Sequence, residues 1–148
     1  MKKIYVVLIL GIFIAGLAIL VVLTSPKNKG TKIDLEKCKI LKDNGENKIN
    51  VVFFSDEKTA EKYINTLYET KPFDNNKDKF NFYFIDYKPD CKIYEEIALL
   101  CYSKKLVEIA GSCPNDYIVV VKDEKPEIRS SAYMNVISIN SNSPSSIF

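Results

Sequence analysis

The sequence predicts an α/β fold, in which an N-terminal transmembrane helix is followed by a mostly parallel sheet flanked by helices. Three observations lead to this prediction. An uncharged run fills positions 4–23, three later runs are rich in β-branched and aromatic residues, and segments of helical composition separate those runs. Strands that alternate with helices form parallel sheets with right-handed crossovers. The expected element order after the transmembrane helix is β-α-β-α-β-β.

The apolar run follows Met1-Lys2-Lys3 and contains only two glycines, Gly11 and Gly16. At ~1.5 Å rise per residue, a helix of this length matches the ~30 Å hydrocarbon core of a bilayer. We predict that residues 1–23 form a signal-anchor helix that contacts the lipid bilayer through residues 4–23. A cleaved signal peptide is the alternative, although the apolar run continues past the weak cleavage site at positions 16–18.

All four cysteines follow this run, at Cys38, Cys91, Cys101 and Cys113. An even number of cysteines in a small domain predicts two disulfides in an oxidising compartment, with buried free thiols as the alternative. The spacing suggests a clamp between Cys101 and Cys113, although four cysteines allow three pairings. Lysines on both sides of the run make the orientation ambiguous. We expect a single-pass protein of the cell membrane with an extracellular domain, or a secreted domain after signal cleavage.

Outside residues 1–23, the remaining 125 residues carry 19 basic and 19 acidic side chains. A neutral domain gives no support for a nucleic-acid partner. This length is enough for one domain with a modest core. We therefore divide the chain into the membrane segment 1–23, a linker and lead-in at 24–47, and an α/β domain at 48–148 that we expect to be incomplete at its C-terminus.

The first strand and helix of this domain are the clearest predicted elements. Positions 48–54 (KINVVFF) are nearly all apolar at their centre, which predicts a strand buried on both faces. Ser55 or Asp56 then caps a helix that runs to about Thr70. Its apolar residues recur at helical spacing, at Ala60, Tyr63, Ile64, Leu67 and Tyr68. We interpret the two tyrosines as core residues.

Positions 80–87 (FNFYFIDY) and 116–122 (DYIVVVK) predict the second and third strands. The segment 93–110 is helical in composition, as one helix or as two short helices that meet near Ser103, and Gly111 is its expected end. Positions 129–140 predict a weaker strand or a hairpin at the sheet edge.

The sequence contains no histidine, which excludes a Ser-His-Asp triad, a Cys-His pair and a His-based zinc site within these residues. Carboxylates follow two predicted strands, at Asp56-Glu57 and at Asp86 and Asp90. Strand ends carry functional carboxylates in many α/β folds, but we favour helix capping for Asp56-Glu57 and a turn for Asp86 and Asp90. Glu95 and Glu96 are adjacent and would point in different directions on a helix. There is also no phosphate-binding glycine loop.

Three segments resemble the zinc-dependent IgA-peptidase family of zincin-type metallopeptidases. The run Asn50-Val51-Val52-Phe53-Phe54-Ser55-Asp56, with Thr59, resembles the opening strand of that family and its Asp-Gly-Tyr-Thr-like turn, although Glu57 and Lys58 replace Gly-Tyr. Pro72-Phe73 and Phe80-Asn81-Phe82-Tyr83-Phe84-Ile85-Asp86 are similar to its second strand segment, and Pro114 with Asp116-Tyr117-Ile118-Val119-Val120-Val121 to its third strand.

This resemblance implies the N-terminal half of a zincin fold, cut before the helix that carries His-Glu-x-x-His. The last residues, Ser143-Pro144-Ser145-Ser146-Ile147-Phe148, have the pattern of a helix start. The resemblance then implies zinc for the full-length protein, a protein or peptide substrate, and an edge strand within 131–139 along which that substrate lies. It assigns no catalytic, cofactor-binding or metal-ligating residue to this chain, which is expected to be inactive and to hold no cofactor by itself.

Two other functions remain open. A complete non-catalytic, membrane-anchored ectodomain would bind an extracellular partner without cleaving it. A small structural envelope protein would share only the α/β core with peptidases. Both alternatives keep the membrane segment and the disulfides and differ from the peptidase in lacking any catalytic helix.

Overall fold

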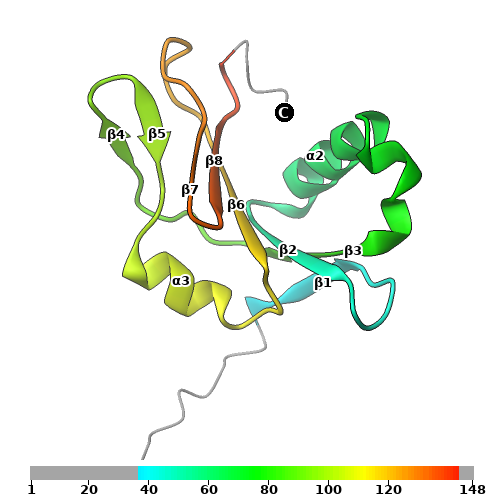
Figure 1. Cartoon of the computed structure of the whole chain (residues 1–148). Helices are drawn as coiled ribbons and strands as arrows, with labels where there is room; N and C mark the ends of the chain where they lie inside the picture. The colour runs from blue at the N-terminus through cyan, green and yellow to red at the C-terminus, as the bar shows by residue number, and fades with distance from the viewer. Residues whose placement is uncertain (1–36, 144–148) are drawn as a thin grey trace, which may run out of the picture. The chain divides into compact units, whose positions relative to one another are not determined.

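The computed structural model describes residues 37–143. These residues form a six-stranded sheet, a separate two-stranded sheet and two α-helices (Figure 1). The strands are β1 (Lys39–Lys42), β2 (Ile49–Phe54), β3 (Phe80–Ile85), β4 (Lys92–Tyr94), β5 (Ala98–Leu100), β6 (Tyr117–Lys122), β7 (Ser131–Tyr133) and β8 (Val136–Asn140). The helices are α2 (Glu57–Glu69) and α3 (Lys104–Ala110), with two 3₁₀ turns at Phe73–Asn75 and Lys77–Lys79.

The strand order of the large sheet is β1-β3-β2-β6-β8-β7. The four central strands, β3, β2, β6 and β8, are parallel, and their register places Val51 opposite Phe82. The edge strands β1 and β7 run antiparallel to their neighbours. Among the parallel strands, β2 lies between β3, which follows it in the chain, and β6, which the chain reaches later on the other side.

The predicted fold class is therefore wrong. The sheet is mixed, with an antiparallel strand on each edge, and one of its faces is covered partly by a β-hairpin. The described residues contain only two α-helices, α2 and α3. The predicted membrane segment at 4–23 lies outside the described residues. Within residues 37–143, neither helix has the length and apolar character needed to cross a bilayer.

The predicted helix at 93–110 is the largest local error. Its first part forms the antiparallel pair β4 and β5, and only Lys104–Ala110 is helical. The turn between the two strands places Glu95 and Glu96 at φ 47° and 60°, a conformation that a helix does not contain. A disulfide joins Cys91 to Cys101 across the base of this hairpin. This covalent bond stabilises the paired strands in a segment whose composition favours a helix. Ser103 caps α3, and Gly111 ends it as predicted.

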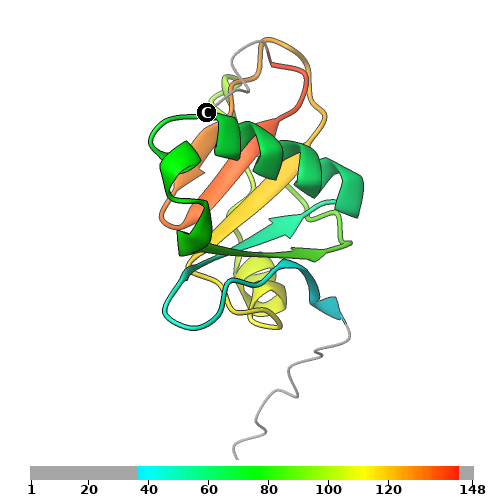
Figure 2. The same cartoon turned by 90° about the vertical axis from the view of Figure 1, so that its right-hand side faces the viewer.

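The helix α2 covers one face of the large sheet, and we call this side the α2 face (Figure 2). Asp56 caps the helix, and the predicted apolar stripe is confirmed, since Ala60, Tyr63 and Ile64 are buried. They pack against alternate residues of the parallel strands, including Phe53 and Phe82. The remaining sheet residues of this cluster are Val51, Phe80, Phe84, Val119 and Ile139.

The opposite face is covered by β4, β5 and α3, which lie to the left of the sheet in Figure 1. We call it the disulfide face. Leu99, Cys101 and Leu106 from these elements are buried against it. The sheet residues of this cluster are Val52, Phe54, Tyr83, Ile85, Ile118, Val120 and Val136. Disulfides connect Cys38 to Cys113 and Cys91 to Cys101, so the suggested clamp between Cys101 and Cys113 is wrong.

The predicted hairpin region at 129–140 contains β7 and β8. Only β7 lies at the sheet edge, because β8 is inserted between β6 and β7. The strand β1 falls within the segment that we expected to be a linker. Its sequence, KILK, is short and half charged, and its exposure fits an edge strand that carries lysines outward.

Candidate functional site

A cavity of about 480 Å³ opens at the carboxyl ends of β2, β3 and β6. The chain continues from β2 to β3 on one side of the sheet and from β6 to β8 on the other, and ligands of open α/β sheets bind at such a switch point between adjacent strands. The lining residues are Phe54, Ser55, Asp56, Thr59, Asp86, Lys88, Pro89, Val120, Val121, Lys122 and Asp123. The structure thus brings together two of the sequence candidates, Asp56 and Asp86.

The carboxylate of Asp56 is engaged in capping α2. One oxygen accepts a hydrogen bond from the Thr59 backbone N–H at 2.9 Å, and the other accepts one from the Thr59 hydroxyl at 2.8 Å. These bonds lower the pKa of Asp56 below its ordinary value, and the charge of Lys88 adds to the effect. These contacts confirm that Asp56 caps α2.

The other charges of the cavity are also partnered in part. Lys122 forms an ion pair with Glu124 at 3.1 Å. Asp123 accepts a short hydrogen bond from the hydroxyl of Ser141. The ion pair lies within the segment around the end of β6, whereas the hydrogen bond joins that segment to the residues after β8 and so holds two sides of the cavity rim together.

The remaining candidate carboxylates lie elsewhere. Glu57 and Asp90 do not line the cavity. Glu95 and Glu96 occupy the exposed turn between β4 and β5. Residues 37–143 contain no cluster of three or more histidine, cysteine, aspartate or glutamate side chains that fits a metal ion. All four cysteines form disulfides.

The second candidate region is the free edge of β7. Tyr133 pairs with Val136 across a two-residue turn, Met134-Asn135, and Ala132 pairs with Ile137. A two-residue hairpin closes on a hydrogen-bonded pair, and such pairs alternate with non-hydrogen-bonded pairs along the strands. The backbone N–H and C=O of Ala132 consequently point away from β8, toward the open edge of the sheet.

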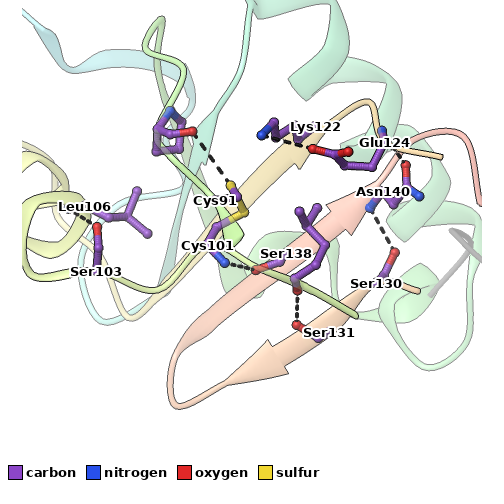
Figure 3. Close-up of a disulfide and its surroundings, with 12 residues drawn as sticks. Cys91, Cys101, Ser103, Leu106, Lys122, Glu124, Ser130, Ser131, Ser138 and Asn140 are labelled. Atoms are coloured by element: carbon purple, nitrogen blue, oxygen red, sulfur yellow. Dashed lines mark hydrogen bonds and ion pairs between the residues drawn. A yellow bond between two sulfur atoms is a disulfide. The ribbon is translucent and has the colours of Figure 1, made fainter. Parts of the chain in front are cut away.

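A buried network fixes the position of this edge (Figure 3). Asn140 is fully buried, and its amide donates to the carbonyl oxygens of Lys125 at 2.9 Å and of Ile128 at 2.7 Å. Its side-chain oxygen accepts from the Glu124 backbone N–H at 3.0 Å, and its own backbone N–H donates to the Ser130 hydroxyl at 3.0 Å. The loop before β7 is therefore fixed to the end of β8, because both the nitrogen and the oxygen of the Asn140 side chain form hydrogen bonds with backbone groups of that loop.

The strand β5 limits the edge on its other side. Arg129, two residues before β7, exchanges backbone hydrogen bonds with Leu99 at 2.9 Å and Ile97 at 2.8 Å. The hydroxyl of Ser131 donates a short hydrogen bond to the Leu99 carbonyl oxygen. The open part of the edge therefore begins after Ser131 and continues to the hairpin turn.

Two tyrosines flank this open part. Tyr133 on β7 and Tyr102, between β5 and α3, form an edge-to-face pair with ring centroids 5.1 Å apart. They remain 53% and 39% exposed, so neither ring belongs to the core. Sequence reasoning missed this pair, since the two residues lie on separate elements and only the fold brings them together.

The two disulfides indicate an extracellular or secreted domain, since such bonds persist in oxidising compartments. No protein-family model matches this chain, and no curated protein matches it.

Proposed function

We propose that residues 37–143 are the peptide-aligning sheet of a membrane-anchored or secreted zinc metallopeptidase, and that they bind an extended peptide along β7. The observation that carries this proposal is the antiparallel edge strand with its outward-facing backbone at Ala132. An extended peptide that adds to a sheet edge is held by main-chain hydrogen bonds. Such binding tolerates many sequences, which suits a protein or peptide substrate.

The family resemblance supports this proposal. Its three segments coincide with β2, β3 and β6, which are adjacent parallel strands of one sheet. The edge strand predicted within 131–139 corresponds to β7. The resemblance therefore covers the strands β2, β3 and β6 and the edge strand that we propose for peptide binding, and it includes no catalytic residue.

We assign no hydrolytic step to residues 37–143. The sequence has no histidine for a His-Glu-x-x-His motif, and the cysteines are joined in disulfides. The contribution of these residues is to bind and orient the peptide. The chain by itself is expected to leave casein intact, and the apolar segment 4–23 would hold the domain at the outer membrane surface unless a signal peptidase removes it.

A non-catalytic ectodomain that binds an extracellular protein is the second candidate. The β4–β5 hairpin favours it, because Ile93, Tyr94 and Ile97 are 39%, 57% and 48% exposed. Exposed apolar side chains clustered on one element mark protein-binding surfaces. The coding sequence after Phe148 separates the candidates, since a nearby His-Glu-x-x-His motif would favour the peptidase and a stop codon the binding domain.

The substitution Ala132→Pro tests peptide binding at the edge. It removes the outward N–H and leaves the ladder to β8 intact, since proline is tolerated on edge strands. We expect the full chain to bind a fluorescein-labelled extended heptapeptide, Lys-Thr-Val-Phe-Val-Thr-Lys, and the variant to bind it about tenfold more weakly, the value of one strong hydrogen bond. Fluorescence anisotropy measures the dissociation constants.

The matched control is Ala132→Thr, which keeps the N–H and is favoured in strands. It is expected to bind the heptapeptide as the unmodified chain does. Equal binding by the proline variant, with its circular dichroism unchanged, would place the peptide elsewhere and exclude β7 as the binding edge.

A further inference from the structure

We infer that the β7 edge selects peptides that carry an aromatic side chain, and that Tyr102 and Tyr133 form the subsite for it. This inference rests on the proposed peptide binding and names the substrate feature that the edge recognises. It follows from the position of the tyrosine pair relative to the outward backbone of Ala132.

The register of an added strand can be derived from the hairpin. Because the backbone groups of Ala132 point outward, an added peptide residue forms its hydrogen-bonded pair with Ala132. If the peptide runs antiparallel to β7, the next peptide residue lies opposite Tyr133 in a non-hydrogen-bonded pair. Such pairs bring the two Cα atoms to about 4.5 Å, the closest approach in an antiparallel sheet. Its side chain lies on the same face as the Tyr133 ring.

That face also carries Tyr102, which is held in place from several directions. The preceding residue, Cys101, is fully buried, is joined to Cys91 by a disulfide, and donates its backbone N–H to the Ser138 hydroxyl at 3.0 Å (Figure 3). The following residue, Ser103, caps α3. Tyr102 is thus an exposed ring on a rigid support, in edge-to-face contact with Tyr133.

The edge offers one such subsite. Toward the start of β7 the backbone of Arg129 is already paired with β5, and Ser131 is bonded to Leu99. On the opposite face the only edge side chain is the methyl group of Ala132, which is exposed. A third ring that joins the two tyrosines gains about 0.5–1.5 kcal/mol beyond the area it buries, which corresponds to about threefold to tenfold in affinity.

The experiment compares two fluorescein-labelled heptapeptides, Lys-Thr-Val-Phe-Val-Thr-Lys and the same peptide with alanine at the central position. The full chain is expected to bind the phenylalanine peptide about threefold to tenfold more tightly. In Tyr133→Ser this preference should disappear, while the alanine peptide keeps its affinity. Tyr117→Ser is the matched control, because Tyr117 is 47% exposed but lies at the start of β6 and belongs to neither candidate surface.

The outcomes distinguish the aromatic subsite from the proposed peptide binding on which it rests. A preference that survives in Tyr133→Ser, or one that is lost equally in Tyr117→Ser, overturns the aromatic subsite while leaving peptide binding intact. Failure of the unmodified chain to bind either peptide overturns the proposed peptide binding, and the subsite with it. Loss of preference in Tyr133→Ser and in Tyr102→Ser, with Tyr117→Ser unaffected, supports the assignment of both rings.

Discussion

The two faces of the six-stranded sheet are covered by different means. On the α2 face, one helix of 13 residues carries an apolar stripe that packs across the strands. On the disulfide face, the apolar residues of the sheet are covered by a hairpin of two three-residue strands and by a seven-residue helix. These short elements cannot hold their conformation by local propensity, since isolated helices shorter than about 12 residues are marginal in water.

Covalent bonds make up for the short elements. Each disulfide ends on the disulfide face, where Cys101 and Cys113 are buried with the core. The α2 face has no disulfide among its core residues and depends on aromatic packing, such as the contact of Tyr68 with Phe82. The disulfide face, which is built from short irregular segments, therefore needs cross-links, whereas the α2 face, which is built on a regular helix, does not. The cross-links also bear on the proposed peptide binding, because Tyr102 lies on the disulfide face, next to Cys101.

Removing the disulfide between Cys38 and Cys113 is the strongest way to test this comparison. It closes a loop with a sequence separation of 75, so its loss as Cys38→Ala/Cys113→Ala should lower the free energy of unfolding by about 4 kcal/mol, through the entropy of the unfolded chain. That is a large share of the ~5–15 kcal/mol stability of a typical domain. Urea unfolding followed by circular dichroism measures the loss.

The matched control is Cys91→Ala/Cys101→Ala, whose loop has a separation of 10 and whose expected loss is about 3 kcal/mol. Hydrogen exchange locates the effect. In both variants the α3 amides should lose protection before those of α2. Equal loss of protection in the two helices would mean that the faces unfold as one unit and that the comparison fails.

The difference between the faces also explains what could be predicted from the sequence. The strands β2, β3 and β6 are recognisable because each is rich in β-branched and aromatic residues and its central residues are buried on both faces. The helix α2 was recognisable from its cap at Asp56 and its apolar spacing. All four elements have a periodic signal that is contained within a single segment.

The disulfide face has no such signal. Residues 93–110 have helical composition, and their strands depend on the Cys91–Cys101 bond and on pairing with Arg129, which lies far along the chain. Sequence alone left the cysteine pairing open. The tyrosine pair depends on the same long-range contacts, so a single segment cannot predict it, whereas the pattern of positions 129–140 does predict a weak strand or hairpin at the sheet edge, where β7 lies.

The helix caps provide a further comparison between the two faces, with the smallest expected effect on stability, because the two helices use caps of different chemistry. Asp56 caps α2 with a carboxylate, and Ser103 caps α3 with a hydroxyl. Loss of either cap as Asp56→Ala or Ser103→Ala should cost about 1 kcal/mol at pH 7. Only the carboxylate titrates in the acid range, so the two costs should respond differently to pH.

Hydrogen bonds from Thr59 lower the pKa of Asp56 below its ordinary value of 3.8 in the folded state. A lowered pKa contributes stability that is fully present above the unfolded value and is lost as the pH falls through the folded value. The cost of Asp56→Ala, measured by urea unfolding, should therefore shrink between pH 7 and about pH 2, while the cost of Ser103→Ala stays constant relative to the unmodified chain at each pH. If the cost of Asp56→Ala did not change with pH, the negative charge of the carboxylate would add nothing to helix capping. The carboxylate cap and the hydroxyl cap would then stabilise their helices in the same way.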